Sequence, residues 1–146
     1  LIGGTGNDRF QAGSGNDSIT GNAGIDTVIY RDDGFDTDSA PATTASVTVN
    51  LATGTATDQW GNTDRIFSVE NIEGSSYSDS LTGDSNGNYI FGDGGDDSIY
   101  GGDGADTIQT VWSGERATTP WMVVWLMTTP ISAITTGPNI GMPPPV

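Results

Sequence analysis

Along two stretches of the chain an apolar residue recurs at every ninth position, mostly with polar neighbours. The nine-residue unit repeats end to end over residues 3–29 and returns over 74–109. Its last three positions, such as Ser98-Ile99-Tyr100, alternate as a short strand does. The six preceding positions are rich in Gly, Asn and Asp, which favour turns. The pattern predicts a stack of three-residue strands joined by tight turns, with one core side chain per unit.

Three columns stand out when the seven units are aligned. The eighth position is always apolar: Phe10, Ile19, Val28, Leu81, Ile90, Ile99 and Ile108. The sixth position reads Asp8, Asp17, Asp26, Asp79, Asn88, Asp97 and Asp106. The fourth is Gly except at Tyr77 and Asn86, and glycine lets a turn aim several carbonyl groups inward. A random Gly- and Asp-rich linker would scatter these residue types over all nine columns.

The charge balance narrows the chemistry of the turns. The chain has 19 acidic and 4 basic residues, a formal net charge of −15, and neither Cys nor His. Such a surface disfavours nucleic acid and anionic membranes, which need basic patches. The absence of Cys and His excludes the usual zinc sites, disulfides and His-dependent catalysis. Hard oxygen ligands remain, and a flexible set of carboxylates and carbonyls suits Ca²⁺.

The unit GGDGADTIQ at 101–109 resembles the GGxGxDxUx nonapeptide of the RTX (repeats-in-toxin) calcium-binding family. The resemblance covers 1–29 and 74–109. It implies an all-β, right-handed parallel β-roll or β-helix solenoid, in which two units make one coil and Ca²⁺ lies between the turns of units n and n+2. Carried over by position, it pairs Asp8 with Asp26, Asp79 with Asp97, and Asn88 with Asp106.

The same resemblance assigns the metal ligands to sixth-position side chains and turn carbonyls. We expect an incomplete site at Asp17, because Phe35 stands where its partner would be. The full predicted metal set is Asp8, Asp17, Asp26, Asp79, Asn88, Asp97, Asp106, Gly3, Gly21, Gly74, Gly83, Gly92 and Gly101. The alternative is that these aspartates form turns without metal.

Residues 30–73 interrupt the period and resemble the spacer found between RTX blocks. We expect a strand over 46–51, a turn at 52–54 and irregular solenoid coils. The acidic residues Asp32, Asp33, Asp36 and Asp38 are interpreted as a solvated loop rather than a further cation site. Trp60 is interpreted as a packing residue rather than a sugar-stacking one.

The composition changes at residue 112, so the predicted organisation is a first block (1–29), a spacer (30–73), a second block (74–111) and a non-repeat tail (112–146), frame-shifted or disordered. The tail has no Asp, all three Met and six of the seven Pro. In a shifted reading frame its codons permit GDDTLDGG over 116–124, which is repeat sequence. We favour that interpretation over a native hydrophobic cap.

The sequence therefore predicts a non-enzymatic, calcium-binding module of a secreted bacterial protein, part of a longer chain exported by type I secretion. It contains no nucleophile–base pair, no HExxH and no phosphate-binding loop. Its longest apolar run, 121–127, is too short for a membrane span. The alternatives are an extracellular adhesive array, or the secretion module of an enzyme or toxin whose active domain lies upstream.

Overall fold

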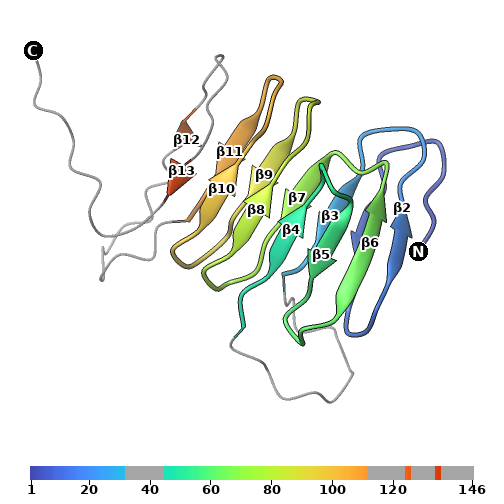
Figure 1. Ribbon diagram of the computed structural model, residues 1–146. Coiled ribbons are helices and arrows are strands. Elements are labelled where there is room, and N and C mark those ends of the chain that lie inside the picture. Colours follow the sequence, from blue (N-terminus) through green and yellow to red (C-terminus); the bar gives the residue numbers. More distant parts are fainter. Residues whose placement is uncertain (32–44, 112–123, 126–133, 136–146) are drawn as a thin grey trace, which may run out of the picture.

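The computed structural model describes residues 1–31 and 45–111, and the backbone of two short strands at 124–125 and 134–135. This part of the chain contains strands and no helix, so the all-β prediction is confirmed. Figure 1 shows the strands stacked side by side in two layers. The acidic segment 32–44, with Phe35, and the rest of the tail from 112 onward lie outside the described residues.

Each repeat contributes one three-residue strand at its seventh to ninth positions. These are β1 (Arg9–Gln11), β2 (Ser18–Thr20), β3 (Thr27–Ile29), β8 (Ser80–Thr82), β9 (Tyr89–Phe91), β10 (Ser98–Tyr100) and β11 (Thr107–Gln109). Successive strands belong to opposite sheets, so that strands two repeats apart pair in parallel within a block: β1 with β3, β8 with β10 and β9 with β11. The register is that of the repeat, because Phe10 pairs with Val28, and Leu81 with Ile99. The predicted parallel β-roll is confirmed.

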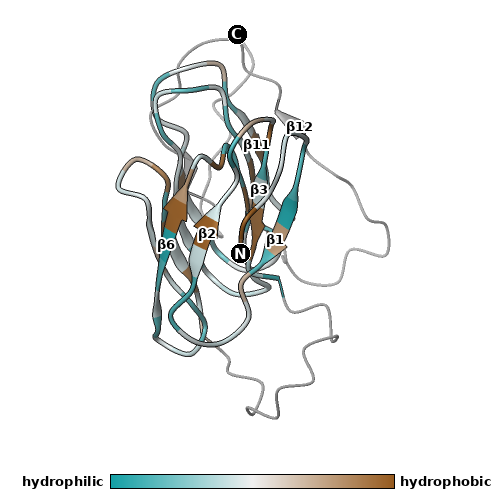
Figure 2. Cartoon of the chain, turned by 90° about the vertical axis from the view of Figure 1, so that its right-hand side faces the viewer, coloured by the Kyte–Doolittle hydropathy of each residue, from teal (hydrophilic) through white to brown (hydrophobic). Residues whose placement is uncertain are grey.

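The first sheet has the order β1-β3-β7-β9-β11-β12, where β7 is Asn71–Glu73 and β12 is Val124–Trp125. The second has the order β13-β10-β8-β4-β5-β6-β2, where β13 is Ile134–Thr135. Both β12 and β13 pair antiparallel with the last repeat strands. Figure 2 views the stack from the end that carries β1 and β2, with apolar segments in the strands of both layers.

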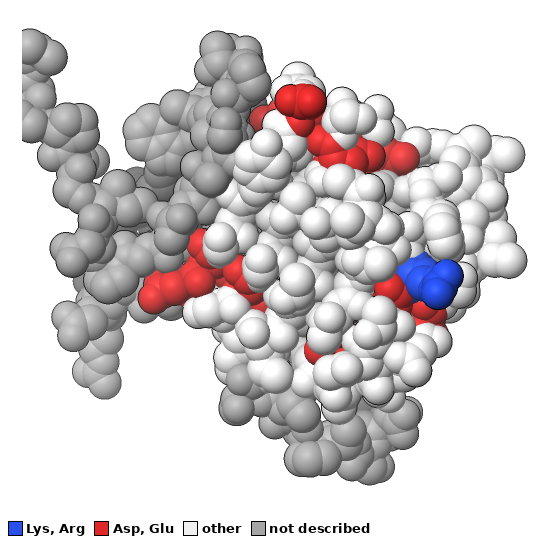
Figure 3. Space-filling view, viewed as in Figure 1, with Lys and Arg blue, Asp and Glu red and all other residues white. Residues whose placement is uncertain are grey.

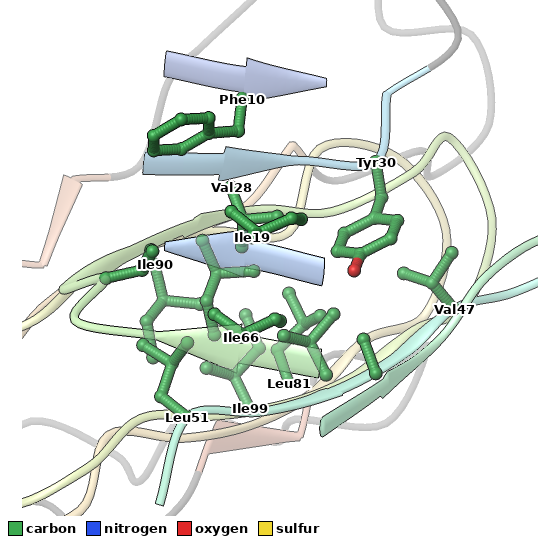
Figure 4. Packing of buried hydrophobic residues seen from close by; sticks show 14 residues of the cluster. Phe10, Ile19, Val28, Tyr30, Val47, Leu51, Ile66, Leu81, Ile90 and Ile99 are labelled. Atoms are coloured by element: carbon green, nitrogen blue, oxygen red, sulfur yellow. The ribbon is translucent and has the colours of Figure 1, made fainter. Parts of the chain in front are cut away.

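The core is a narrow column of side chains between the two sheets (Figure 4). Eighth-position residues form most of it, and Ile19, Val28, Leu81 and Ile90 are completely buried. Their neighbours in each strand point outward, because side chains alternate along a strand. Ile108, in the last repeat, is only partly buried against this column. One side chain per repeat, and so two per coil, therefore supplies the apolar burial of the repeat blocks.

The spacer is built into the same sheets. Strands β4 (Thr48–Asn50), β5 (Thr55–Thr57) and β6 (Thr63–Phe67) form antiparallel pairs with one another. The outer two continue the roll, since β6 pairs in parallel with β2, and β4 with β8. The strand and turn expected at 46–54 are present, as β4 and the turn that follows it. The interruption therefore inserts β4, β5 and β6 into the second sheet and β7 into the first without ending the stack.

Candidate metal centre

The turns between strands form two stacks on opposite edges of the roll. We call them the Asp26 edge, with turns 3–8, 21–26, 83–88 and 101–106, and the Asp97 edge, with turns 12–17, 74–79 and 92–97. Acidic side chains gather in separate groups near opposite edges of the face shown in Figure 3. Because each strand is only three residues long, the two edges lie close to the apolar column.

Sixth-position residues two repeats apart are joined directly. The backbone N–H of Asp8 donates to Oδ1 of Asp26 at 2.8 Å. The same bond joins Asp79 to Oδ1 of Asp97 at 3.1 Å, and Asn88 to Oδ1 of Asp106 at 3.0 Å. The structure thus brings together the three pairs that the sequence predicts, and one oxygen of each later carboxylate is held by backbone.

The first-position glycines make room for the second oxygen. A Cβ atom added at Gly3 or Gly74 would lie 2.5 Å from Oδ2 of the sixth-position Asp in the same turn. At four other glycines it would lie closer still to the sixth-position side chain, to Oδ1 of Asn88 in one turn and to Oδ2 of an Asp in the other three. These four are Gly21, Gly83, Gly92 and Gly101. At three of these glycines the added Cβ would also lie close to the carbonyl oxygen of the first-position glycine two repeats later. At Gly3, for example, this is the carbonyl oxygen of Gly21. Carboxylate or amide oxygens and carbonyl oxygens therefore converge at the first position of these three turns, at Gly3, Gly74 and Gly83.

In three turns a backbone donor satisfies that second oxygen, and we call these turns closed. The second-position N–H of Gly4 donates to Oδ2 of Asp8 at 2.7 Å. Ser75 donates in the same way to Oδ2 of Asp79 at 2.6 Å, and Asp84 to Oδ1 of Asn88 at 2.8 Å. A closed turn therefore holds its sixth-position side chain by itself.

The other four turns, which we call open, have a second-position residue in the left-handed region. These residues are Gly13 (φ 73°), Asn22 (φ 76°), Asp93 (φ 62°) and Gly102 (φ 97°). In three open turns the Oδ2 atom is buried without a hydrogen-bond partner in the described structure: Asp17, Asp26 and Asp106. A buried carboxylate oxygen without a partner is costly. Each predicted pair joins a closed turn to an open one.

In the part of the chain that the structure describes, no salt bridge compensates the buried carboxylates of the turns. Burial, together with the nearby carboxylates of Asp79, Asp93 and Asp96, raises the pKa of Asp97 to about 7, although the hydrogen bond from the Asp79 backbone opposes the rise. Burial also raises the pKa of Asp79, against the opposing effect of hydrogen bonds from Ser75 and Val47. Both Arg9 and Arg31 pair with Glu73 of β7 instead. The edges therefore favour a cation.

The donor set fits Ca²⁺. Its atoms are carboxylate and carbonyl oxygens, the ligands that Ca²⁺ takes at irregular angles. No group of three or more Asp, Glu, His or Cys residues converges on a metal position in the described residues. A cation here would therefore need the turn carbonyls as well as the carboxylates, and the first-position glycines bring these within reach.

Sequence reasoning missed two residues that take sixth-position places. The N–H of Asp17 donates to Oδ1 of Asp64 at 2.9 Å, across 47 residues. The N–H of Asp26 donates to Oε2 of Glu70 at 2.8 Å, across 44 residues. The expectation that Asp17 faces the position of Phe35 is therefore wrong, because β6 follows β2 in the sheet. Ile66 pairs with Ile19, and Ile72 pairs with Val28. The feature of the spacer sequence that could have identified Asp64 and Glu70 is therefore the apolar residue that follows each of them by two positions.

Asn88 and Trp60 have structural partners. The Asn88 amide donates to the carbonyl oxygen of Glu70 at 2.7 Å, a contact that a carboxylate could not make. Trp60 lies in the turn between β5 and β6, where Oδ1 of Asp58 accepts its backbone N–H at 2.9 Å. Its indole Nε1 is buried without a hydrogen-bond partner in the described structure. Packing remains our interpretation of this Trp.

The comparisons with known proteins agree with the geometry. The model of the RTX calcium-binding nonapeptide repeat family matches four copies over residues 1–28 and 70–108. The second matched segment begins at Glu70, inside the spacer. None of the curated proteins matches the chain. The described residues include no helix that could span a membrane.

Proposed function

The repeats at 1–28 and 70–108 belong to the RTX calcium-binding nonapeptide repeat family and bind Ca²⁺, and from this premise we propose that the chain is a secreted module that folds on calcium outside the cell. The repeats form a structural, calcium-binding module of a bacterial protein. Secretion by the type I route, and membership of a longer exported chain, are parts of the proposal.

The observation that carries the proposal is the set of partnerless buried oxygens in the open turns. Oδ2 of Asp26 lies against Gly21, and Oδ2 of Asp106 lies against Gly101. Each of these oxygens places negative charge beside the backbone, at a position where no hydrogen-bond donor among the described residues reaches it. Bound Ca²⁺ supplies the positive charge that these turns lack. The residues that would hold it are Asp17, Asp26, Asp97 and Asp106 of the open turns, with Asp8, Asp79, Asn88 and the first-position glycines of the predicted set.

Folding and binding should be one event. The core of the blocks is one side chain wide, and ordering each backbone residue costs about 1–2 kcal/mol. Burial removes water from the carboxylates of the folded state, and they also repel one another; the raised pKa of Asp97 reflects both effects. A ligand that binds only the folded state offsets both costs. Without it, the unfolded chain is favoured.

Because of this coupling, the chain would fold only after export from the cell. Extracellular calcium modules bind with dissociation constants of about 10⁻⁴ to 10⁻³ M, far above the calcium level of a resting cytosol. An unfolded chain inside the cell suits passage through a secretion channel, and folding would follow where calcium is abundant.

A calcium titration followed by far-ultraviolet circular dichroism tests the proposal. We expect a disordered spectrum in chelator and a cooperative gain of β structure with a midpoint of about 10⁻⁴ to 10⁻³ M. A midpoint near cytosolic calcium would refute the timing of folding, and equal β signal with and without chelator would refute the coupling.

A further inference from the structure

The spacer turn at residues 68–70 takes the place of a repeat turn in the stack, although it has fewer residues. The N–H of Gly21 donates to the carbonyl oxygen of Phe67 at 2.9 Å, as Gly3 does to the ninth-position residue Thr20. Phe67 therefore ends a repeat-like strand, and Ser68 takes the first position of the next turn. Glu70 then occupies the sixth-position place after only one intervening residue. Its side chain is one methylene longer than that of Asp, so it still reaches the N–H of Asp26.

Ser68 and Asp26 meet at Gly21. A Cβ atom on Gly21 would collide with both the carbonyl oxygen of Ser68 and Oδ2 of Asp26. Ser68 has a φ of 50°, in the left-handed region that a non-glycine residue rarely adopts. Asp26 is completely buried, and its Oδ2 has no hydrogen-bond partner in the described structure. Two acceptor oxygens thus share one small space without a donor between them.

Glu70 adds a second carboxylate beside this space. Besides accepting the Asp26 N–H, it donates its own backbone N–H to the carbonyl oxygen of Asp26 at 3.2 Å. The adjacent Asn71 donates to the same oxygen at 2.9 Å. Hydrogen bonds of both the backbone and the side chain of Glu70 therefore hold it beside Asp26.

The other junction between the first block and the spacer is different. Asp64 takes the sixth-position place beyond Asp17, but the hydroxyl of Tyr30 donates to its Oδ2 at 2.9 Å. The first position of the Asp17 turn is Ala12, whereas the other six repeats have glycine there. At this junction on the Asp97 edge a hydroxyl already satisfies Oδ2 of the spacer carboxylate, so the junction serves as an internal comparison.

We propose that Asp26, Glu70 and the carbonyl oxygen of Ser68 form a Ca²⁺ site that joins the first repeat block to the spacer. Two carboxylates and a carbonyl oxygen are hard ligands of the kind Ca²⁺ prefers. The site rests on the proposed function, since it requires that Ca²⁺ occupies open turns. It extends the calcium stack beyond the nonapeptides, across a turn that lacks the repeat motif.

Equilibrium dialysis with radioactive calcium, on the whole chain, tests the site by counting bound ions. The variants are Asp26→Asn, Glu70→Gln and the double variant. Glu70→Gln removes the charge but keeps an oxygen that can accept the Asp26 N–H, so it tests the site even if Asp26→Asn does not fold. The control Asp103→Asn removes an exposed carboxylate, and Asp106→Asn reports on a site within the second block.

We expect each single variant to bind one Ca²⁺ fewer than the unmodified chain, and the double variant to lose the same single ion. An unchanged ion count for Glu70→Gln would overturn the site, as would the loss of two ions in the double variant. If Asp106→Asn alone loses an ion, the proposed function stands and this site falls. If the unmodified chain binds no calcium, the proposed function fails and the site with it.

Discussion

The backbone N–H of Asp79 donates a 3.1 Å hydrogen bond to Oδ1 of Asp97, so that two buried carboxylates stand in consecutive turns of one edge. Burial raises the pKa of both, that of Asp97 to about 7. Protons and calcium can each relieve the same unfavourable charge. The two should therefore compete for the Asp97 edge.

Acidification should stabilise the calcium-free fold. Because the pKa of Asp97 rises from 3.8 in the unfolded chain to about 7, the folded chain binds more protons between these values. The stabilisation is full below pH 3.8 and is lost as the pH rises through about 7. Circular dichroism in chelator should show more β structure at pH 5 than at pH 8, and Asp97→Asn should reduce the difference. A calcium-free β signal that grows with pH would contradict this.

Neighbouring carboxylates in one turn should differ in their effect on calcium. Asp97 is buried at the sixth position, whereas Asp96 is exposed at the fifth. Asp97→Asn should raise the calcium midpoint for folding about tenfold, equivalent to about 1.4 kcal/mol. Asp96→Asn removes the same charge and should stay within about 0.5 kcal/mol, as surface changes usually do. Equal shifts in the two variants would mean that the aspartates act as diffuse charge.

Calcium should be preferred over magnesium at equal millimolar concentration. The turns offer carbonyl and carboxylate oxygens on a flexible backbone, whereas Mg²⁺ demands a small octahedron and retains water. Isothermal titration calorimetry should show calcium binding with a folding enthalpy and little heat from magnesium. Folding by Mg²⁺ at the same concentration would rule out the irregular oxygen cage.

Glycines of the same column should not be equivalent. Gly24 has a φ of 142°, and a Cβ on it would collide with the carbonyl oxygen of Gly6 in the turn beneath. A Cβ on Gly6 meets nothing within 4 Å. Gly24→Ala should therefore cost more than about 1 kcal/mol in urea unfolding at saturating calcium, and Gly6→Ala should be nearly neutral. Similar losses would show that the turns do not stack as described.

The period of nine predicted the parts of the fold that depend only on the period. Two repeats make one coil, so a separation of 18 residues pairs Asp8 with Asp26 and Phe10 with Val28. The partners Asp64 and Glu70 could not be found in this way, because they depend on how many residues the spacer inserts.

The distinction between open and closed turns was also beyond the sequence. Gly4 and Gly102 are the same residue at the same position, yet only Gly102 has a positive φ. A Cβ on Gly102 would collide with the carbonyl oxygen of Asp84 in the preceding turn of that edge. Its conformation is therefore set together with the stacking of the turns, which the order of residue types does not encode.

A crystal structure of the chain grown in calcium, with the ions located by their anomalous scattering, would show whether Ca²⁺ binds between the turns. We predict ions beside the sixth-position carboxylates of the open turns, at Asp26, Asp97 and Asp106, each within reach of turn carbonyls. Ions confined to exposed acidic side chains, or an ordered roll with no ion between its turns, would contradict this prediction.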